Sequence, residues 1–100
     1  MKLRILALTV LSALSVSASA NETLDEIKKR CKSDMGQYGA SLVKTCIDMD
    51  LAVIDDLNKF STSHKNTYNR CMRDMRSHGF NLVHTCITMD VEAQKAIDNY

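Results

Sequence analysis

The sequence lacks a long hydrophobic run outside its first twenty residues, and it lacks an excess of charge of either sign. After residue 20, no stretch approaches the roughly 18 uninterrupted apolar residues that span a membrane, so no stable membrane anchor is expected. The 100 residues carry 13 basic and 12 acidic side chains, a formal net charge of +1. This balance excludes a polycationic nucleic-acid-binding protein. The short length also excludes a large enzyme with an ordinary substrate cleft.

The sequence also lacks the motifs that indicate catalysis. It contains no Cys-x-x-Cys pair, no nucleophile elbow, no glycine-rich phosphate loop and no His-Glu-x-x-His helix. The adjacent acids Asp55 and Asp56 are typical of a solvated helix surface rather than of a general acid–base pair. We therefore expect a protein that is not an enzyme and that needs no cofactor.

The first twenty residues have the features of an export signal. Lys2 and Arg4 form a basic start, residues 5–16 are mainly apolar, and Ala-Ser-Ala at residues 18–20 matches a cleavage site. Removal of this segment leaves residues 21–100, with 11 basic and 12 acidic side chains. We expect the protein to be exported to the periplasm or to the extracellular space.

Four cysteines follow the predicted signal, and they are Cys31, Cys46, Cys71 and Cys86. In an exported chain an even number of cysteines predicts disulfides, here two. A zinc site made of the four thiolates is disfavoured, because 14 residues separate the members of each pair. Zinc-binding pairs are usually separated by roughly two to four residues.

The sequence contains an internal repeat with a period of 40 residues. Residues 21–60 align with residues 61–100 without a gap, and 12 positions are identical. All of these fall within residues 30–50 and 70–90, which share the pattern R-C-x-x-D-M-x-x-x-G-x-[SN]-L-V-x-T-C-I-x-M-D. The sequence therefore predicts two copies of one structural unit within a single compact domain.

Each copy is expected to form a helical hairpin. Thr23 is a suitable N-cap for the first helix, Gly39 stands where a left-handed C-cap would end it, and Ser41 can cap the second helix. The second copy repeats these signals at Ser63, Gly79 and Asn81. No window shows the alternation of a strand. We expect an all-α fold, in which two disulfide-linked hairpins pack as a small pseudo-two-fold four-helix bundle.

A continuous helix through Gly39 is the alternative, at a cost of about 1 kcal/mol relative to alanine. The two arrangements predict different disulfides. A turn at the repeated glycine pairs the cysteines of each copy, Cys31–Cys46 and Cys71–Cys86, and this is the favoured pairing. Long helices would instead give Cys46–Cys71 and Cys31–Cys86.

Charged residues recur at the same positions in both copies. They are Arg30, Asp34 and Asp50 in the first copy and Arg70, Asp74 and Asp90 in the second. In each copy the arginine and the first aspartate are spaced as an i,i+4 pair on one helix face, and the last aspartate could extend the pair into a small network. We interpret these residues as structural, with a ligand site as the alternative.

Binding is the function that remains after these exclusions. The second helix of the first copy is more apolar than its counterpart, at Leu51, Val53, Ile54 and Leu57. We expect a non-catalytic, exported protein-interaction module that contacts an unidentified protein partner, or a second copy of itself, through this surface. The alternative is that these side chains only fill the core.

A carrier of a small ligand or of a metal ion is the alternative function. The interior of the bundle could hold a small ligand. In the second copy, Met72, Met75, His78 and His84 supply thioether and imidazole groups of the kind that bind copper or zinc. Their spacing is loose, and the methionines suit the core equally well, so no metal site is assigned.

Cleavage of the chain at Lys59 and Lys65, with the disulfides left intact, tests the pairing. If the cysteines pair within each copy, non-reducing mass spectrometry should show two separate halves, because no covalent bond then joins residues 21–59 to residues 66–100. Halves that stay joined until a reductant is added would show the long-helix pairing instead.

Overall fold

The computed structural model describes the backbone from residue 15 onward and the side chains from residue 22 onward. Most of the predicted export signal, residues 1–20, therefore lies outside the described residues. Residues 15–20 are included only as the first part of a helix.

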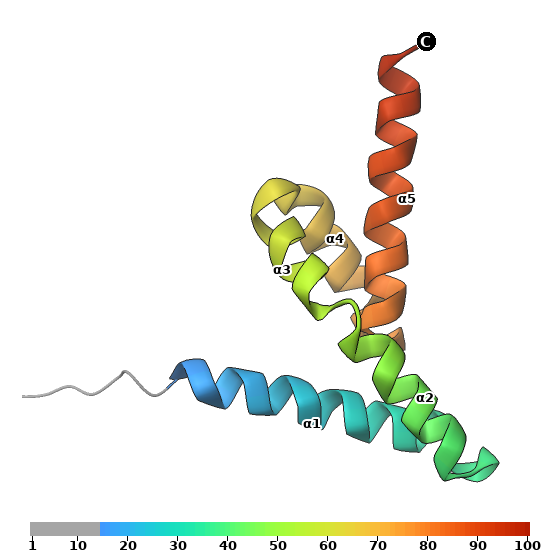
Figure 1. Cartoon of the computed structure of the whole chain (residues 1–100). Coiled ribbons are helices and arrows are strands. Elements are labelled where there is room, and N and C mark those ends of the chain that lie inside the picture. Colours follow the sequence, from blue (N-terminus) through green and yellow to red (C-terminus); the bar gives the residue numbers. More distant parts are fainter. Residues whose placement is uncertain (1–14) are drawn as a thin grey trace, which may run out of the picture.

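Residues 15–100 are helical almost throughout and contain no strand, which confirms the all-α fold (Figure 1). In chain order the elements are α1 (Ser15–Met35), the 3-10 turn η1 (Gly36–Tyr38), α2 (Ala40–Leu51), α3 (Ile54–Ser63), α4 (Lys65–Met75), the 3-10 turn η2 (Arg76–His78) and α5 (Phe80–Asp98). The expected boundary between the copies, at residues 60 and 61, falls inside α3.

The helices break at Gly39 and Gly79, so the continuous long helix does not form. Both glycines have positive φ, 104° and 109°, with ψ of 164° and 154°. This combination is open essentially to glycine alone, because a Cβ would clash with the backbone. It differs from the expected left-handed C-cap, which has a much smaller ψ. The expected N-caps are also wrong. Helix α1 runs through Thr23, and α2 and α5 begin directly after the glycines, so that Ser41 and Asn81 lie inside the first turns of these helices.

Two disulfides join helices that are packed against each other. Cys31 of α1 is bonded to Cys46 of α2, and Cys71 of α4 is bonded to Cys86 of α5, with Cα–Cα distances of 5.7 and 5.8 Å. Such bonds suggest an environment outside the cytoplasm, where thiols can stay oxidised. Among residues 15–100, no helix combines the length and the hydropathy that crossing a membrane requires.

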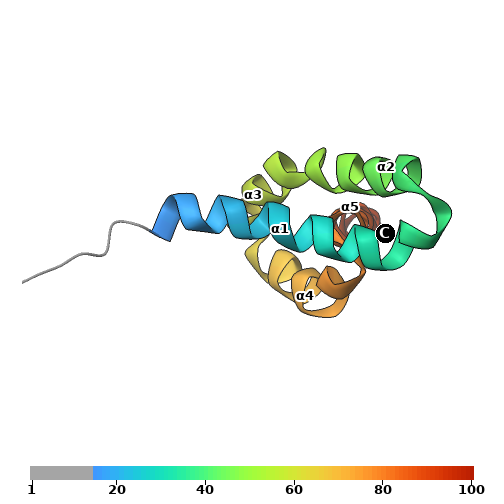
Figure 2. The same ribbon diagram turned by 90° about the horizontal axis from the view of Figure 1, so that it is seen from below.

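The two copies differ after their last shared residue, Asp50 or Asp90. In the first copy the helix stops at Leu51 and the chain turns into α3, whereas α5 runs without a break to Asp98. Leu57 of α3 is buried in the core, and this burial draws α3 back toward α4. All residues of α5 after Val91 are exposed. This part of the helix extends away from the other elements in Figure 1, and α5 is seen nearly end-on in Figure 2.

The core lies where α1, α3, α4 and α5 meet. Its buried members are Ile27, Cys31, Leu57, Cys71, Phe80, Val83 and Ile87. Helix α2 contributes only half-buried side chains to it, among them Val43 and Ile47. The core thus joins side chains of both copies, with Phe80 at the start of α5 packed among residues of the first copy and the second.

An ion pair on the surface links α1 to η2. The Arg76 guanidinium donates two hydrogen bonds to the Glu26 carboxylate, at 2.8 and 2.6 Å, and it also lies 5.5 Å from the centre of the Phe80 ring. The hydrogen bond from Arg76 holds the pKa of Glu26 below its usual value of 4.5, because it stabilises the ionised form. The pair therefore adds a charged link between the copies beside the core.

This ion pair predicts a loss of stability in acid. The ionised Glu26 contributes stability above pH 4.5, and the contribution disappears as the pH falls through the lowered pKa of the folded state. Since both side chains are more than a third exposed, solvent screening limits the contribution to about 0.5 kcal/mol. In urea unfolding, Glu26→Gln should be less stable than the unmodified protein by this amount at about pH 7 and equal to it at about pH 3.

Glu22→Gln is the matched control, because it changes an exposed carboxylate one turn earlier on α1. It should leave the free energy of unfolding unchanged at both pH values. A deficit of Glu26→Gln that persisted in acid would contradict the assignment.

Candidate functional site

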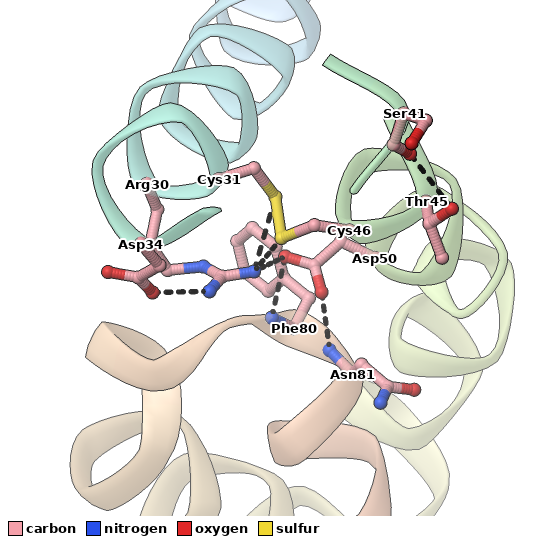
Figure 3. Close-up of a disulfide and its surroundings, with 9 residues drawn as sticks. All are labelled: Arg30, Cys31, Asp34, Ser41, Thr45, Cys46, Asp50, Phe80 and Asn81. Atoms are coloured by element: carbon pink, nitrogen blue, oxygen red, sulfur yellow. Dashed lines mark hydrogen bonds and ion pairs between the residues drawn. A yellow bond between two sulfur atoms is a disulfide. The ribbon is translucent and has the colours of Figure 1, made fainter. Parts of the chain in front are cut away.

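The candidate site lies where the end of α2 meets the start of α5 (Figure 3). Asp50, in the last turn of α2, is only 2% exposed. Its Oδ2 accepts a hydrogen bond from the Phe80 N–H at 3.2 Å, and its Oδ1 accepts one from the Asn81 N–H at 3.1 Å. These are the first two amides of α5, where a helix has unsatisfied donors and a partial positive charge. A carboxylate from the first copy therefore caps a helix of the second copy.

Arg30 of α1 neutralises this carboxylate. One of its terminal nitrogens lies 3.0 Å from Asp50 Oδ2, and the other lies 2.9 Å from Asp34 Oδ2. The nitrogen that binds Asp50 also approaches the disulfide, at 3.2 Å from Cys46 Sγ and 3.4 Å from Cys31 Sγ. The disulfide thus holds α1 and α2 at the separation that lets the arginine reach the aspartate (Figure 3).

Gly79 makes this contact possible. A Cβ at this position would lie 2.6 Å from the Arg30 guanidinium, which is closer than real Cβ atoms approach. A side chain here would also be strained by the positive φ. Gly39 has the same backbone conformation, but a Cβ there would meet nothing within 4 Å. The two repeated glycines therefore share a conformation and differ in their surroundings.

The second copy keeps the ion pair without the helix that it caps. Arg70 and Asp90 are 2.9 Å apart, and the Thr67 hydroxyl donates to Asp90 at 3.2 Å. Their side chains are 42% and 48% exposed, against 20% and 2% for Arg30 and Asp50. The contact between the copies is thus made in one direction, which differs from the reciprocal contact that a two-fold axis would give. The ion pair of Asp74 is with Arg73, not with Arg70 as the spacing predicted.

An open pocket of about 180 Å³ lies beside Asp50, between α1 and α2 and the start of α5. Its lining is mainly apolar and includes Met35, Leu42, Met49 and Leu82. The last three are 46%, 49% and 40% exposed. We call these four residues the α2–α5 face. This face was not predicted from the sequence, although the repeat holds a signal for it: leucine and methionine recur at positions 42/82 and 49/89, and these side chains are exposed in both copies.

The apolar surface expected from the sequence is largely part of the core. Leu57 is 4% exposed, and Val53 and Ile54 are half-buried against the core cluster. Only Leu51 remains on the surface, at 44% exposure. These residues make α3 fold back, and they do not form one docking surface.

The histidines and methionines considered for a metal site point to different places. His84 lies on the side that faces α3, where its Nε2 is 3.1 Å from Asp56 Oδ2 and its ring is near that of Phe60. His78 lines the pocket beside Asp50, whereas Met72 lines another pocket with residues of α3. Met75 is half-buried against the core. Within the described part of the chain, no three His, Cys, Asp or Glu side chains are grouped closely enough to hold a metal ion.

Comparison with known proteins finds no matching family model, no matching curated protein and no matching solved structure. The geometry of the chain itself therefore carries the functional argument.

The repeat offers a matched test of the Asp50 contact. Asp50→Asn should lower the free energy of unfolding by about 3 kcal/mol, because it leaves the Arg30 guanidinium without its buried partner. Asp90→Asn removes the equivalent but exposed partner of Arg70, and it should cost less than about 1 kcal/mol. Urea unfolding followed by circular dichroism measures both. Equal losses would show that the capping of α5 contributes little to stability.

Proposed function

We propose that the protein is a non-catalytic, exported interaction protein that binds a partner protein through the α2–α5 face. The observation that carries this proposal is the group of large apolar side chains around one open pocket: Leu42, Met49 and Leu82 are each at least 40% exposed. Exposed apolar side chains gathered in one place are typical of surfaces that bind other proteins. Methionine adds adaptability, because its flexible thioether can pack against irregular surfaces.

The rigidity of the surroundings supports the same function. The Cys31–Cys46 disulfide fixes α1 against α2, and the Asp50 carboxylate fixes the start of α5 against α2. The backbone beneath the face is therefore ordered before a partner arrives. Binding to such a surface loses less conformational entropy than binding to a flexible one.

The scaffold in this proposal is a tandem pair of 40-residue helical hairpins. Each contains a helix, a 3-10 turn, a glycine with positive φ and a second helix, and each carries a disulfide across a separation of 15 residues. The first copy also includes most of α3. The one-directional contact of Asp50 with α5 favours a head-to-tail relation of the hairpins over a two-fold axis. The two disulfides support export, and residues 1–20 are proposed as its signal.

A photo-crosslinking amino acid in place of Met49 tests the proposal. Produced in its native host and irradiated, the protein should form a covalent adduct with another protein, because Met49 lines the α2–α5 face. The same probe in place of Lys59, an exposed residue of α3, should give no adduct.

A second change separates a specific contact from chance encounters. Leu82→Asp, introduced together with the Met49 probe, should abolish the adduct, because a charge then enters the apolar lining of the same pocket. Leu82 is 40% exposed, so the fold should tolerate the substitution. An adduct that persists in the Leu82→Asp protein, or that forms equally at Lys59, would contradict the proposal.

A further inference from the structure

Arg70 and Asp90 are arranged like Arg30 and Asp50, the pair in the first copy that binds the start of α5. The arginine lies 2.9 Å from the aspartate, as Arg30 lies 3.0 Å from Asp50. Asp90 also lines an open pocket of about 250 Å³, so its carboxylate is accessible. In the first copy the equivalent carboxylate receives two backbone amides from α5. In the second copy Asp90 binds Arg70 and Thr67, which both belong to α4.

The start of α2 has the form that this arrangement binds. Gly39 has φ 104° and ψ 164°, close to the 109° and 154° of Gly79, so the first amides of α2 leave the turn as those of α5 do. The N-cap of α2 is Gly39, which has no side chain that could accept a hydrogen bond from the first amides of the helix. A Cβ at Gly39 would meet nothing within 4 Å, whereas Gly79 lies against a guanidinium. The space that Arg30 occupies beside Gly79 is thus open beside Gly39.

Apolar side chains surround both ends. Internally, Leu82 and His78 of the second copy meet Leu42 and Met49 of the first around one pocket. In the repeat, Leu82 and Met89 correspond to Leu42 and Met49, and Tyr38 and Leu42 correspond to His78 and Leu82. Tyr38, Leu42, Leu82 and Met89 are exposed, at 61%, 46%, 40% and 67%. The surface around Asp90 and the surface around the start of α2 therefore each carry exposed polar and apolar groups that match one side of the internal contact.

We propose that a second copy of this chain binds at these surfaces, head to tail. The Asp90 carboxylate of one molecule accepts the Ala40 and Ser41 amides of the next, Arg70 packs against Gly39, and the four apolar side chains close around the contact. The contact repeats, between molecules, the interface that Asp50 and Arg30 make within one. This proposal rests on the proposed function and names one partner of the interaction protein.

The contact involves two different surfaces, so each molecule keeps one free end after pairing. Such heterologous contacts form rings when the rotation closes and open chains when it does not. The contact should also be weaker than the internal one, because Ala40 replaces Phe80 and Thr67 replaces Ile27. Both Phe80 and Ile27 are buried in the core, so less apolar area is covered between molecules than within one. Association should thus be reversible and should increase with concentration.

Sedimentation velocity of the purified, disulfide-bonded protein from micromolar to millimolar concentration measures this association. The sedimentation coefficient should rise with concentration. Asp90→Asn should weaken association roughly tenfold or more, because a charged acceptor of two amides is lost. Ala40→Glu should weaken it similarly by placing a negative charge against Asp90, while an acid in the first turn of α2 favours the helix itself. Glu92→Gln and Ala96→Glu, which change exposed residues of α5, are the matched controls and should associate normally.

Mixing the two variants gives the sharper result. The Asp90→Asn protein keeps an intact start of α2, and the Ala40→Glu protein keeps an intact Asp90. Each should stay monomeric alone. Their mixture should form a one-to-one dimer that grows no further. A wild-type protein that stays monomeric at every concentration would overturn the proposal, as would association that survives both substitutions or a mixture that fails to pair. The contact shares Leu42 and Leu82 with the α2–α5 face, but Met49 and the polar pair Arg70–Asp90 each belong to only one of the two surfaces. An adduct of Met49 with a different protein that persists in Asp90→Asn would therefore support the proposed function whatever the sedimentation result.

Discussion

The structure depends on one buried carboxylate. Asp50 is removed from water, and such a charge is stable only when it is paired and hydrogen-bonded. Arg30 supplies the opposite charge, and the first two amides of α5 supply the hydrogen bonds. Each partner depends on another feature: the disulfide places the helix of Arg30, and Gly79 lets the backbone of α5 approach the guanidinium. The position of α5 relative to the first copy follows from meeting these conditions together.

The different ends of the two copies follow from what each helix can bury. After Leu51 the first copy has apolar residues that reach the core once the chain turns, above all Leu57. The equivalent part of α5 carries Ala93 and Gln94 where the first copy has Val53 and Ile54. A turn there would bury little apolar area, so the helix continues and its last residues stay exposed. One shared pattern thus gives two shapes, because hydrophobic burial acts on the residues outside the pattern.

Much of the fold could be predicted from the repeat, since local features determine it. A glycine at the same place in both copies indicated the helix breaks, and cysteines eight residues before and seven residues after it indicated bonds within each copy. The capping of α5 could not be predicted. Its acceptor is 30 residues away in the chain, and its donors are backbone amides, which every residue except proline provides. Ser41 and Asn81 were predicted as caps because sequence patterns register neighbouring residues, whereas α5 is capped by a tertiary contact from Asp50.

The surface was the hardest part to predict, for a related reason. An apolar residue such as Leu57 has the same periodicity whether its helix continues straight or turns back into the core. The bend after Leu51 buries Leu57, whereas its counterpart Ile97 on the unbent α5 is 58% exposed. The histidines of the second copy were equally ambiguous, because η2 and α5 direct His78 and His84 toward different helices.

The one-directional cap has a consequence for how such a chain can evolve. A hairpin whose second helix is capped by the preceding hairpin, and whose own last shared aspartate can cap the next, sets no intrinsic limit on the number of units. In solenoid proteins, units that contact only their neighbours can be added or lost singly, and specialised terminal units protect the ends. In this chain Ala40 stands where the second hairpin has Phe80, and α5 stays straight where the first hairpin bends into α3. The two outer surfaces therefore differ from the junction between the hairpins. A longer homologue with three or more hairpins would need no new kind of contact, only further copies of the Asp50–Phe80 junction.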